Sequence, residues 1–421
     1  MTIAPEISRL RDRAFAIWSA GLAAADPAEA VRASLARDPL PPPAPGGRLL
    51  VIAVGKAARA MTGAALEVLR GKGWAPPEAL VVTNYENAGD LPGATVMAAG
   101  HPVPDENGHR AAEAVLAALR PLGANDRVLA LISGGGSALL PAPVEGVTLA
   151  EKAEVSRLLL ASGAPIEEMN LVRQQLSRLK GGGMLRAAAP AKVTALILSD
   201  VVGDDLSVIA SGPTVAPVGT KAEARAALEA RGIWTRLPVS VRAHLEAPAQ
   251  ALPPLPEADN RLVGSNAASV RAMEEAGARI FLRPVTGDVG DAVQRIMDEA
   301  IKVSPGGAIG FGGETTVTIR GDGKGGRNQE LALRFALLAE GRLEGDWAFL
   351  SAGTDGRDGP TEAAGGIVDP STLTRMRAAG LDAEDALARN DSNTALSACD
   401  GLVMTGGTGT NVADLMVFVR G

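Results

Sequence analysis

At residues 49–61 the chain reads LLVIAVGKAARAM, and this stretch decides the fold class. Residues 49–54 form a continuous apolar run, which predicts a strand that is buried on both faces. Gly55-Lys56 then leads into an alanine-rich segment that predicts a helix over 57–70. Uninterrupted apolar strands that alternate with helices are typical of parallel sheets covered by helices on both sides. The stretch therefore predicts an α/β protein.

The same alternation continues through both halves of the chain. In the second half, AIGFG at 308–312 and TTVTIR at 315–320 predict a hairpin that turns at Gly312-Gly313. Other strands are expected at 79–83, 95–99, 127–132, 192–198, 261–264, 278–282, 347–352, 402–404 and 415–419.

A proline-rich stretch without helical or strand period, APAQALPPLPEAD at 247–259, predicts a boundary or a surface connection. We therefore expect an N-terminal α/β domain over 1–247 and a C-terminal α/β domain over 260–421. Both are expected to be of the doubly wound type.

Composition excludes several classes of protein. The 421 residues include 41 Lys and Arg and 48 Asp and Glu, so the net charge is −7. The sequence has no basic run, which argues against a nucleic-acid partner. The single cysteine, Cys399, excludes an internal disulfide and a multi-cysteine zinc site. No 18 apolar residues run without charge, and the charged start lacks a signal peptide, so we expect a cytoplasmic protein that spans no membrane.

Two glycine turns after strands suggest an anion site. Ser133-Gly-Gly-Gly-Ser137 follows the strand 127–132, and successive glycine N–H groups can turn toward a phosphate. A tight turn is the alternative, because neither GxxxxGK[ST] nor GxGxxG is present. Lys56 stands at a helix start, where a cation is unfavourable by about 0.3–1 kcal/mol unless an anion compensates it. This conflict favours a ligand.

Further ionic residues follow other elements of the first half. Arg173 and Lys180 lie on or after the helix 166–179, where they could hold oxygens of a substrate or phosphate, or serve as a solvated face beside a glycine cap. Asp200 and Asp204 follow the strand 192–198 and suit Mg²⁺. Asp205 fits an Asx turn better.

The second half repeats this pattern. Glu314 follows Gly312-Gly313, and Arg327-Asn328 opens a helix, where a guanidinium could clamp a carboxylate or phosphate. Asp355 and Asp358 lie among glycines at a strand end, which suggests a base or a metal ligand, with a plain turn as the alternative. Cations, backbone donors and aspartates at one cleft would suit phosphoryl transfer.

A series of segments, taken in order, resembles one family. They are VGKAA at 54–58, GHPVPDENG at 100–108, LISGGGSALL at 131–140, NLVRQQLSRLKGGG at 170–183, LILSDVVGDDLSVIASGPT at 196–214, GGETTVTIRGDGKGGRNQELAL at 312–333, AGTDGRDGPTEAAGGIVD at 352–369 and TGTNVADL at 408–415. The chain resembles the class II glycerate kinases, the glycerate 2-kinase family that ends in a MOFRL domain, some members of which are labelled hydroxypyruvate reductase. Gly407 stands where the family has proline, and Asn393 where it has an aromatic residue.

The resemblance implies ATP-dependent phosphorylation of D-glycerate to 2-phosphoglycerate with Mg²⁺, at an active site in the cleft between two Rossmann-like doubly wound domains. ATP and D-glycerate are the expected partners, and a homodimer is an open alternative to a monomer. An NAD(P)H-dependent hydroxypyruvate reductase is the second hypothesis, although we find no dinucleotide fingerprint. The expected roles are catalytic for Lys56, Arg327 and Asp355; nucleotide or phosphate binding for Ser133, Gly134, Gly135, Gly136, Ser137 and Lys180; substrate binding for Arg173, Asn328 and Glu314; and metal binding for Asp200, Asp204 and Asp358.

Overall fold

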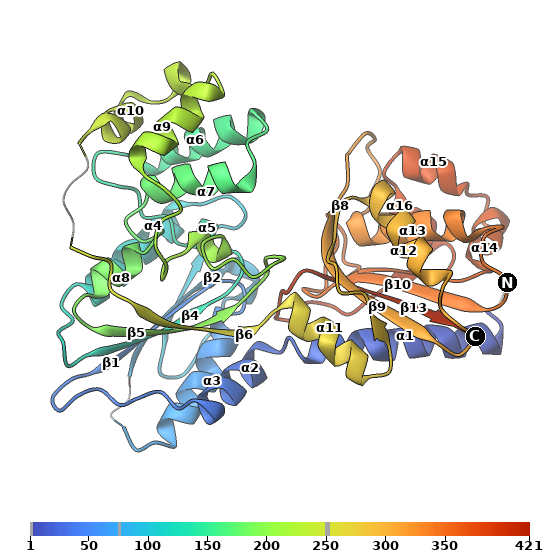
Figure 1. Ribbon diagram of the computed structural model, residues 1–421, viewed down its shortest axis with the longest axis horizontal. Helices are drawn as coiled ribbons and strands as arrows, with labels where there is room; N and C mark the ends of the chain where they lie inside the picture. Colours follow the sequence, from blue (N-terminus) through green and yellow to red (C-terminus); the bar gives the residue numbers. More distant parts are fainter. Residues whose placement is uncertain (1–2, 75–76, 249–252) are drawn as a thin grey trace. The chain divides into compact units, whose positions relative to one another are not determined.

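The computed structural model describes residues 3–74, 77–248 and 253–421. The chain divides into two compact units (Figure 1). Unit 1 consists of Met1–Asp26 and Gly264–Gly421, and unit 2 is Pro27–Val263. The α/β class expected from the sequence is confirmed. Residues 249–252 of the expected boundary lie outside the described part of the chain.

Unit 2 is built on a six-stranded sheet with the order β3-β2-β1-β4-β5-β6. Its inner strands pair in parallel, as their continuous apolar runs predict. The strands are β1 (Leu49–Val54), β2 (Glu78–Asn84), β3 (Thr95–Ala99), β4 (Arg127–Ile132), β5 (Lys192–Leu198) and β6 (Ala258–Gly264). The strand order is that of a doubly wound sheet, in which ligands bind at the carboxyl ends of the strands.

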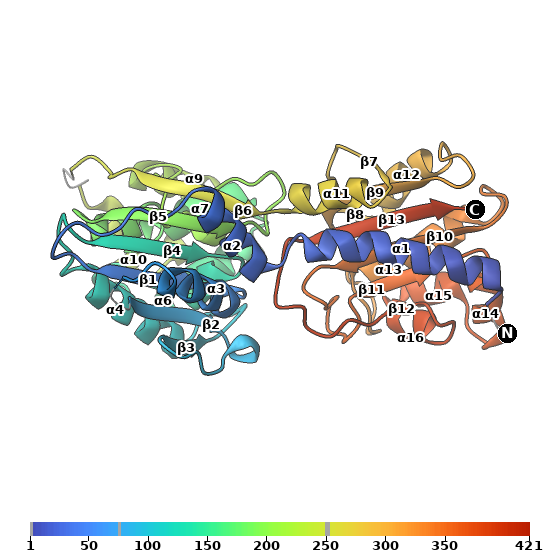
Figure 2. The same cartoon turned by 90° about the horizontal axis from the view of Figure 1, so that it is seen from below.

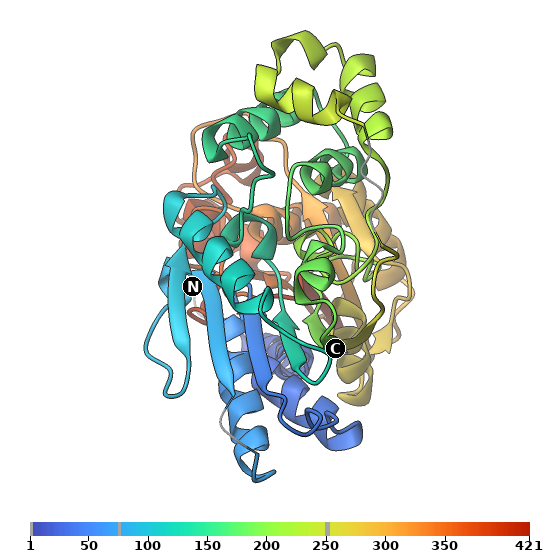
Figure 3. The same ribbon diagram turned by 90° about the vertical axis from the view of Figure 1, so that its left-hand side faces the viewer.

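Helices cover both faces of this sheet. α2 and α3 lie on one face and α4, α5 and α8 on the other, while α9 and α10 lie beyond α6 and α7, on the side away from the sheet (Figures 1 and 3). The helices of unit 2 are α2 (Pro27–Arg37), α3 (Ala58–Arg70), η1 (Tyr85–Asn87), α4 (Glu106–Leu119), α5 (Gly136–Leu139), α6 (Leu149–Ala161), α7 (Ile166–Gln175), α8 (Gly183–Ala188), η2 (Ile209–Ser211), α9 (Lys221–Ala230), η3 (Trp234–Arg236) and α10 (Val239–Glu246).

Unit 1 contains a seven-stranded sheet that differs from the expected doubly wound form. Along β12-β11-β10-β13-β9 all pairs are antiparallel, and only β7 and β8 pair with β9 in parallel. The strands are β7 (Arg279–Ile280), β8 (Val285–Asp288), β9 (Ala308–Thr316), β10 (Trp347–Gly353), β11 (Gly365–Val368), β12 (Leu402–Val403) and β13 (Asp414–Arg420). A buried apolar strand has the same sequence pattern whether its neighbours run parallel or antiparallel to it, so the sequence could not predict the direction of pairing.

The hairpin expected at Gly312-Gly313 is wrong, because β9 passes through both glycines as one strand. A side chain at Gly312 would lie 2.0 Å from Asn266 Oδ1, and one at Gly313 would lie 2.0 Å from the Val285 carbonyl oxygen. These glycines therefore allow a close approach of neighbouring segments and do not form a turn.

The N-terminal helix α1 (Pro5–Ala23) belongs to unit 1, whereas the sequence placed it in the first domain. Ala14, Ile17 and Trp18 are buried in one core with Leu415 and Val417 of β13. Figure 2 shows α1 running along β13 and β10. Burial of these apolar side chains holds α1 against the sheet of unit 1, and this burial depends on a strand about 400 residues away in the chain.

The remaining helices of unit 1 include α12 and α13, which pack on β9, β10 and β13 with the aromatic side chains Phe311, Phe335 and Phe349 between them. They are α11 (Asn266–Glu275), α12 (Val289–Ala300), α13 (Arg327–Ala339), α14 (Thr372–Ala378), α15 (Ala383–Ala388) and α16 (Ser392–Ser397). Within the described ranges, no helix has the length and apolar character that crossing a bilayer requires.

Candidate functional site

The glycine turns after β1 and β4 pack directly against each other. Strand register places Val54 beside Ile132, so the turns leave the sheet side by side. The Lys56 N–H donates to the Gly134 carbonyl oxygen at 2.9 Å, and the buried Ser133 Oγ accepts from the Ala57 N–H at 3.1 Å. A side chain at Gly55 would lie 2.1 Å from Ser133 Oγ. Ser133 thus holds the turn that carries Lys56.

Asp200 and His101 lie against the same glycine loop. A Cβ at Gly134 would stand 2.1 Å from Asp200 Oδ2, and a Cβ at Gly135 would stand 3.1 Å from His101 Cδ2 and 3.4 Å from Lys56 Cγ. Burial raises the pKa of the Asp200 carboxyl, and the Lys56 ammonium partly offsets this. Burial, together with repulsion from Lys56, lowers the pKa of His101. His101 is therefore a neutral imidazole near pH 7, placed beside a cation.

A second group of cations in unit 2 lies next to Ser137. The buried Lys180 Nζ donates to the Ser137 carbonyl oxygen and to Ser137 Oγ, both at 2.8 Å. Lys180, Arg173 and Lys152 line one pocket of about 440 Å³, together with Gly135 and His101. Burial and repulsion from its neighbours lower the pKa of Lys180, and burial followed by repulsion from Arg173 lowers that of Lys152 to about 7. Arg173 and Lys180 are thus together, as expected.

In unit 1, Arg327 begins α13 and is clamped by a carboxylate of β13. Its Nε donates to Asp414 Oδ2 at 2.6 Å and its Nη2 to Asp414 Oδ1 at 3.0 Å, while Nη1 lies 3.0 Å from Glu314 Oε1. The Asp414 side chain is fully buried, whereas that of Arg327 remains 34% exposed. Burial alone would lower the pKa of Arg327, but the Asp414 carboxylate more than offsets this and raises it. The guanidinium is a fixed, permanent cation.

Asp358 lies at the N-terminus of α13, where its carboxylate accepts backbone hydrogen bonds. Asp358 Oδ1 accepts from the Asn328 N–H at 3.1 Å, and Oδ2 accepts from the Gln329 N–H at 2.8 Å and Gln329 Nε2 at 3.0 Å. Burial raises the pKa of Asp358 to about 6. These contacts are those of a carboxylate that accepts hydrogen bonds at the N-terminus of a helix, and the expected metal role of Asp358 stays a prediction.

Asn328 is also engaged within its unit. Its Nδ2 donates to Asp414 Oδ1 at 2.9 Å, and its Oδ1 accepts from Ser351 Oγ at 2.6 Å. Because both ends of the buried amide are hydrogen-bonded, Asn328 is placed to hold Asp414, and its expected contact with substrate stays a prediction.

Asp355 lies close to this cluster. Its Oδ1 accepts from the Arg357 N–H at 3.0 Å. A Cβ at Gly353 would stand 3.4 Å from Asp355 Oδ1 and 3.5 Å from Asp414 Oδ1, so the two carboxylates flank one glycine. Unit 1 therefore places Asp355 near Asp414, and Asp414 and Glu314 both pair with Arg327.

The metal assignment divides between the units. Asp200 and Asp204 lie in unit 2 and Asp358 in unit 1, and within residues 3–74, 77–248 and 253–421 no three His, Cys, Asp or Glu side chains form a metal site. Mg²⁺ that arrives on a nucleotide needs only one or two carboxylates, because phosphate and water supply the other oxygens. Asp200, which touches the glycine loop, fits this need. Asp205 accepts the Ser207 N–H at 2.8 Å, which confirms its Asx turn.

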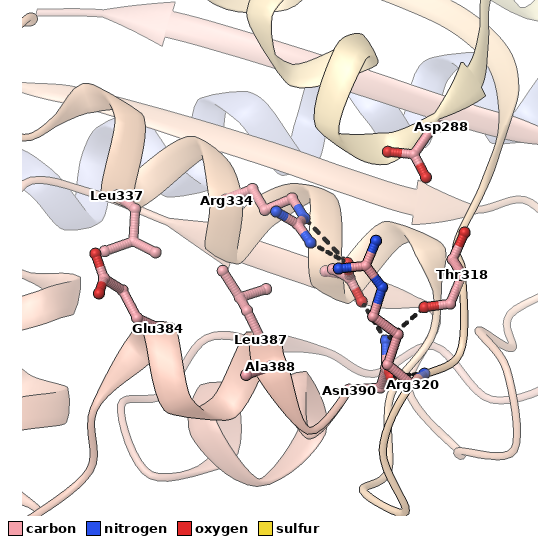
Figure 4. Close-up of a pocket in the computed structure, with 10 residues that line it drawn as sticks. Asp288, Thr318, Arg320, Arg334, Leu337, Glu384, Leu387, Ala388 and Asn390 are labelled. Carbon is pink, nitrogen blue, oxygen red and sulfur yellow. Dashed lines mark hydrogen bonds and ion pairs between the residues drawn. The ribbon is translucent and has the colours of Figure 1, made fainter.

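A further pocket, of about 390 Å³, lies in unit 1 between α13, α15 and the segment 318–320. Figure 4 shows Arg334 among the side chains that line this pocket. Arg334 Nη2 contacts the buried carboxylate of Glu330 at 2.8 Å. Asn390 Nδ2 donates to the same carboxylate at 3.2 Å. The charge of Arg334 is thus balanced internally, and no residue of the predicted site lines this pocket.

Three residues of these clusters escaped the sequence analysis. Asp414 stands at the head of the apolar run LMVFV, and a carboxylate next to a buried strand was a usable signal. His101 lies in the quoted segment GHPVPDENG but had no partner in sequence. Lys152 lies in an ordinary helical pattern, LAEKAEV, and nothing in that pattern marked it as buried.

Comparison with known proteins shows the family of the chain. Residues 13–246 match a domain of unknown function, DUF4147, and residues 307–414 match the MOFRL family. The chain is 44% identical to a D-glycerate 2-kinase of Thermotoga maritima over 88% of this chain and 90% of that relative. It is 41% identical to a putative hydroxypyruvate reductase of Agrobacterium vitis, over 96% and 93% of the two chains.

A solved structure supports the same relationship. The crystal structure of glycerate kinase from Thermotoga maritima has a TM-score of 0.88 and 39% sequence identity, covering 98% of this chain and 100% of that one. By sequence and by structure, the chain belongs to the glycerate 2-kinase family whose members join a DUF4147 domain to a MOFRL domain.

Proposed function

We propose that this protein is an ATP-dependent glycerate kinase that phosphorylates the 2-hydroxyl group of D-glycerate to give 2-phosphoglycerate. The observation that carries the proposal is the 44% identity to a D-glycerate 2-kinase over nearly the whole of both chains. The two ionic clusters, one in each unit, are of the kind that phosphoryl transfer needs. Such a reaction depends on positioning and charge neutralisation more than on covalent chemistry.

In unit 2, the backbone of Gly134–Gly136 would cradle phosphate oxygens and Lys56 would neutralise the transferring phosphoryl group. The Lys56 backbone is tied to Gly134, so its side chain starts from a fixed point on the loop. Ser133 supports this loop from below. Its Oγ is buried, so we assign it to the support of the turn and not to direct phosphate contact.

In unit 1, Arg327 would bind the carboxylate of glycerate or an oxygen of the phosphoryl group. The Arg327 side chain is 34% exposed to solvent, while Asp414 holds Nε and Nη2, the inner edge of the guanidinium. Asp355 is the leading candidate to accept the proton of the 2-hydroxyl group, because it lies at a strand end near Asp414, the carboxylate that holds this cation. Glu314 pairs with Arg327 at 3.0 Å, and substrate would compete with it for the guanidinium.

Mg²⁺ would arrive with ATP and neutralise the charge on its phosphates. Asp200 is the residue best placed to hold it, with Asp204 in the following turn as a second candidate. The raised pKa of Asp200 reflects its burial, and a bound cation would favour the ionised carboxylate. A cytoplasmic location is part of the same proposal, since ATP is the phosphoryl donor.

The direct test is the product formed from D-glycerate and ATP with Mg²⁺, identified by phosphorus and proton NMR. We expect 2-phosphoglycerate and ADP in equal amounts, and almost none from a Lys56→Ala variant. Formation of 3-phosphoglycerate would contradict the proposed acceptor hydroxyl. Wild-type turnover by Lys56→Ala would contradict the role of that lysine.

A double-mutant cycle tests whether Lys56 and Arg327 act on the same reacting group. Lys56→Met and Arg327→Met should each lower kcat by about 10²–10³-fold, as the loss of a preorganised donor does. If both act on one group, their effects are not additive in free energy. Strictly additive losses would mean that the two cations act independently.

The second candidate is an NAD(P)H-dependent hydroxypyruvate reductase, which the name of the Agrobacterium relative and the strand order of unit 2 favour. Against it, the turn after β1 has a single glycine followed by Lys56, and β2 ends in Asn84 where such enzymes carry an acidic ribose ligand. Oxidation of NADH or NADPH with hydroxypyruvate, followed at 340 nm, decides between the two. Turnover there, with none from ATP and D-glycerate, would replace the kinase proposal.

A further inference from the structure

The pocket behind Ser137 has two chemically distinct walls. Its cationic wall is formed by Lys152 of α6, Arg173 of α7 and Lys180 of the following turn. Its apolar wall consists of side chains from the loop after β3, from the segment after β4 and from α6, namely Val103, Pro104, Ala138, Pro141, Leu149, Ala153 and Leu160. Gly135 of the glycine loop opens into the same space.

The cationic wall has no counter-charge of its own. Lys152 donates to the Leu176 carbonyl oxygen at 3.2 Å and Lys180 to Ser137. Within the described part of the chain, neither lysine nor Arg173 forms an ion pair with a carboxylate. Lys152 and Lys180 are buried and Arg173 is partly buried. Grouping these cations is unfavourable because each loses hydration and repels the others. A ligand with several negative charges would remove this penalty.

The apolar wall and the volume restrict the class of ligand. Val103 and Leu160 line the pocket and are 70% and 62% exposed, so they present apolar surface to a ligand. Glycerate offers no apolar surface for them, and it would leave most of about 440 Å³ unfilled. A nucleobase has a flat, apolar face, and the volume falls within the roughly 300–1,000 Å³ of pockets that bind small molecules and cofactors.

Resting on the kinase function proposed above, we propose that this pocket is the nucleotide subsite. Lys152, Lys180 and Arg173 bind the phosphate chain, and the wall of Val103, Leu149 and Leu160 contacts the base. The phosphate chain then runs past Ser137 toward Gly135 and Lys56, where the terminal phosphoryl group is transferred. This assigns Arg173 to the nucleotide, whereas the sequence analysis assigned it to the acid substrate.

Filling the apolar wall tests the base contact. Ala153 is exposed on α6 and lines the pocket, so Ala153→Leu narrows this space without disturbing the core. Binding of MgATP and of tripolyphosphate is measured by titration calorimetry without glycerate. We expect Ala153→Leu to weaken MgATP binding at least tenfold and to leave tripolyphosphate binding unchanged. Ala226→Leu, an exposed position on α9 that lines no pocket described above, should change neither.

Removing a cation tests the phosphate contact. Arg173→Gln should weaken the binding of MgATP and of tripolyphosphate to a similar extent, at least tenfold. Arg231→Gln, which removes a cation paired with Glu168 in the same unit, should leave both affinities unchanged. Unchanged MgATP affinity in both Ala153→Leu and Arg173→Gln would overturn the proposal, provided that circular dichroism shows both folded. A raised KM for D-glycerate with an unchanged KM for ATP would also overturn it and assign the pocket to the acid.

The binding arm separates this proposal from the proposed function. If the protein bound MgATP in this pocket but transferred no phosphoryl group to glycerate, the kinase assignment would fail and the subsite would stand. If it phosphorylated glycerate and Ala153→Leu changed nothing, the subsite would fail and the kinase assignment would stand.

Discussion

Asp414→Asn changes a single atom at the inner edge of Arg327 and leaves the shape of the strand intact. In the native protein, Asp414 accepts from Arg327 Nε and Nη2 and from Asn328 Nδ2, and its side chain is fully buried. The amide keeps one acceptor oxygen but turns an NH₂ group toward one of these donors. It also removes the negative charge that holds the guanidinium in place.

The expected loss of stability follows from these contacts. Breaking a buried ion pair by removing one partner costs about 3–5 kcal/mol, and a hydrogen bond to a charged group contributes about 1.5–3 kcal/mol. Because the Arg327 side chain is 34% exposed, water can solvate part of its charge, so we expect about 2–3 kcal/mol. For a domain of 150–250 residues this lowers Tm by about 4–12 °C.

The expected loss of activity is larger than the loss of stability suggests. A guanidinium released from Asp414 no longer presents its outer edge in one orientation, and a misplaced donor lowers turnover by about 10²-fold. Steady-state kinetics with D-glycerate and ATP, measured well below the Tm of the variant, should therefore show a large fall in kcat and a small change in the KM for ATP.

Asp369→Asn is the matched control for this prediction. Asp369 is another fully buried carboxylate of unit 1, and it pairs with Arg375 at 3.0 Å and Arg11 at 2.7 Å, away from Arg327 in the hydrogen-bond network. It should lose at least as much stability as Asp414→Asn and keep its kcat. Wild-type kcat in Asp414→Asn, or equal kcat losses in both variants, would refute the positioning of Arg327 by Asp414.

Gly134→Ala should lower kcat and destabilise the protein by about 1–3 kcal/mol, because the added Cβ would lie 2.1 Å from Asp200 Oδ2. Gly63→Ala, whose Cβ would lie 3.7 Å from a leucine methyl group, should change neither kcat nor stability. A fully active Gly134→Ala enzyme in steady-state kinetics would contradict the packing of this loop. At pH 8, the protein should take up protons when it binds MgATP, because Lys152 has a pKa of about 7 and a nearby phosphate raises that pKa. Calorimetry in two buffers of different ionisation enthalpy measures the proton uptake, and Lys152→Met should abolish it. Equal binding enthalpies for the wild type in both buffers would count against the subsite. The pKa of Asp369 is lowered to about 2, so its stabilising effect is present above pH 4 and is lost as the pH falls from about 4 to 2. Denaturant unfolding of the wild type and Asp369→Asn should therefore converge over this range, and a constant difference would contradict the shift.

Much of unit 2 could be predicted from the sequence because its signals are local. Four of its strands, β1, β3, β4 and β5, are largely apolar runs followed directly by glycine or serine, and β2 ends in Asn84. Their parallel pairing brings the turns after them to one edge of the sheet. Lys56 and the loop Gly134–Gly136 therefore lie together, as the pattern predicted. The conflict between Lys56 and the helix dipole was a local signal of the same kind.

Unit 1 could be predicted less well, because its pairings are long-range. The direction of β10 and β13, the place of α1 and the continuity of β9 through Gly312 and Gly313 all depend on segments that are far apart in the chain. An apolar run has the same period in a parallel and in an antiparallel pair, so hydrophobic patterning cannot distinguish them.

The sequence by itself determined the kinds of side chain available: cations and carboxylates on glycine-rich turns at the ends of buried strands. Only the tertiary structure decided which of them meet. Arg327 and Asp414 are 87 residues apart, yet the pairing of β13 with β9 and the packing of α13 on the sheet join them. Burial likewise turned Lys152 from an ordinary helical residue into part of a cationic wall. The physical reason is that burial and charge pairing depend on distance in space, whereas periodicity reports only neighbours along the chain.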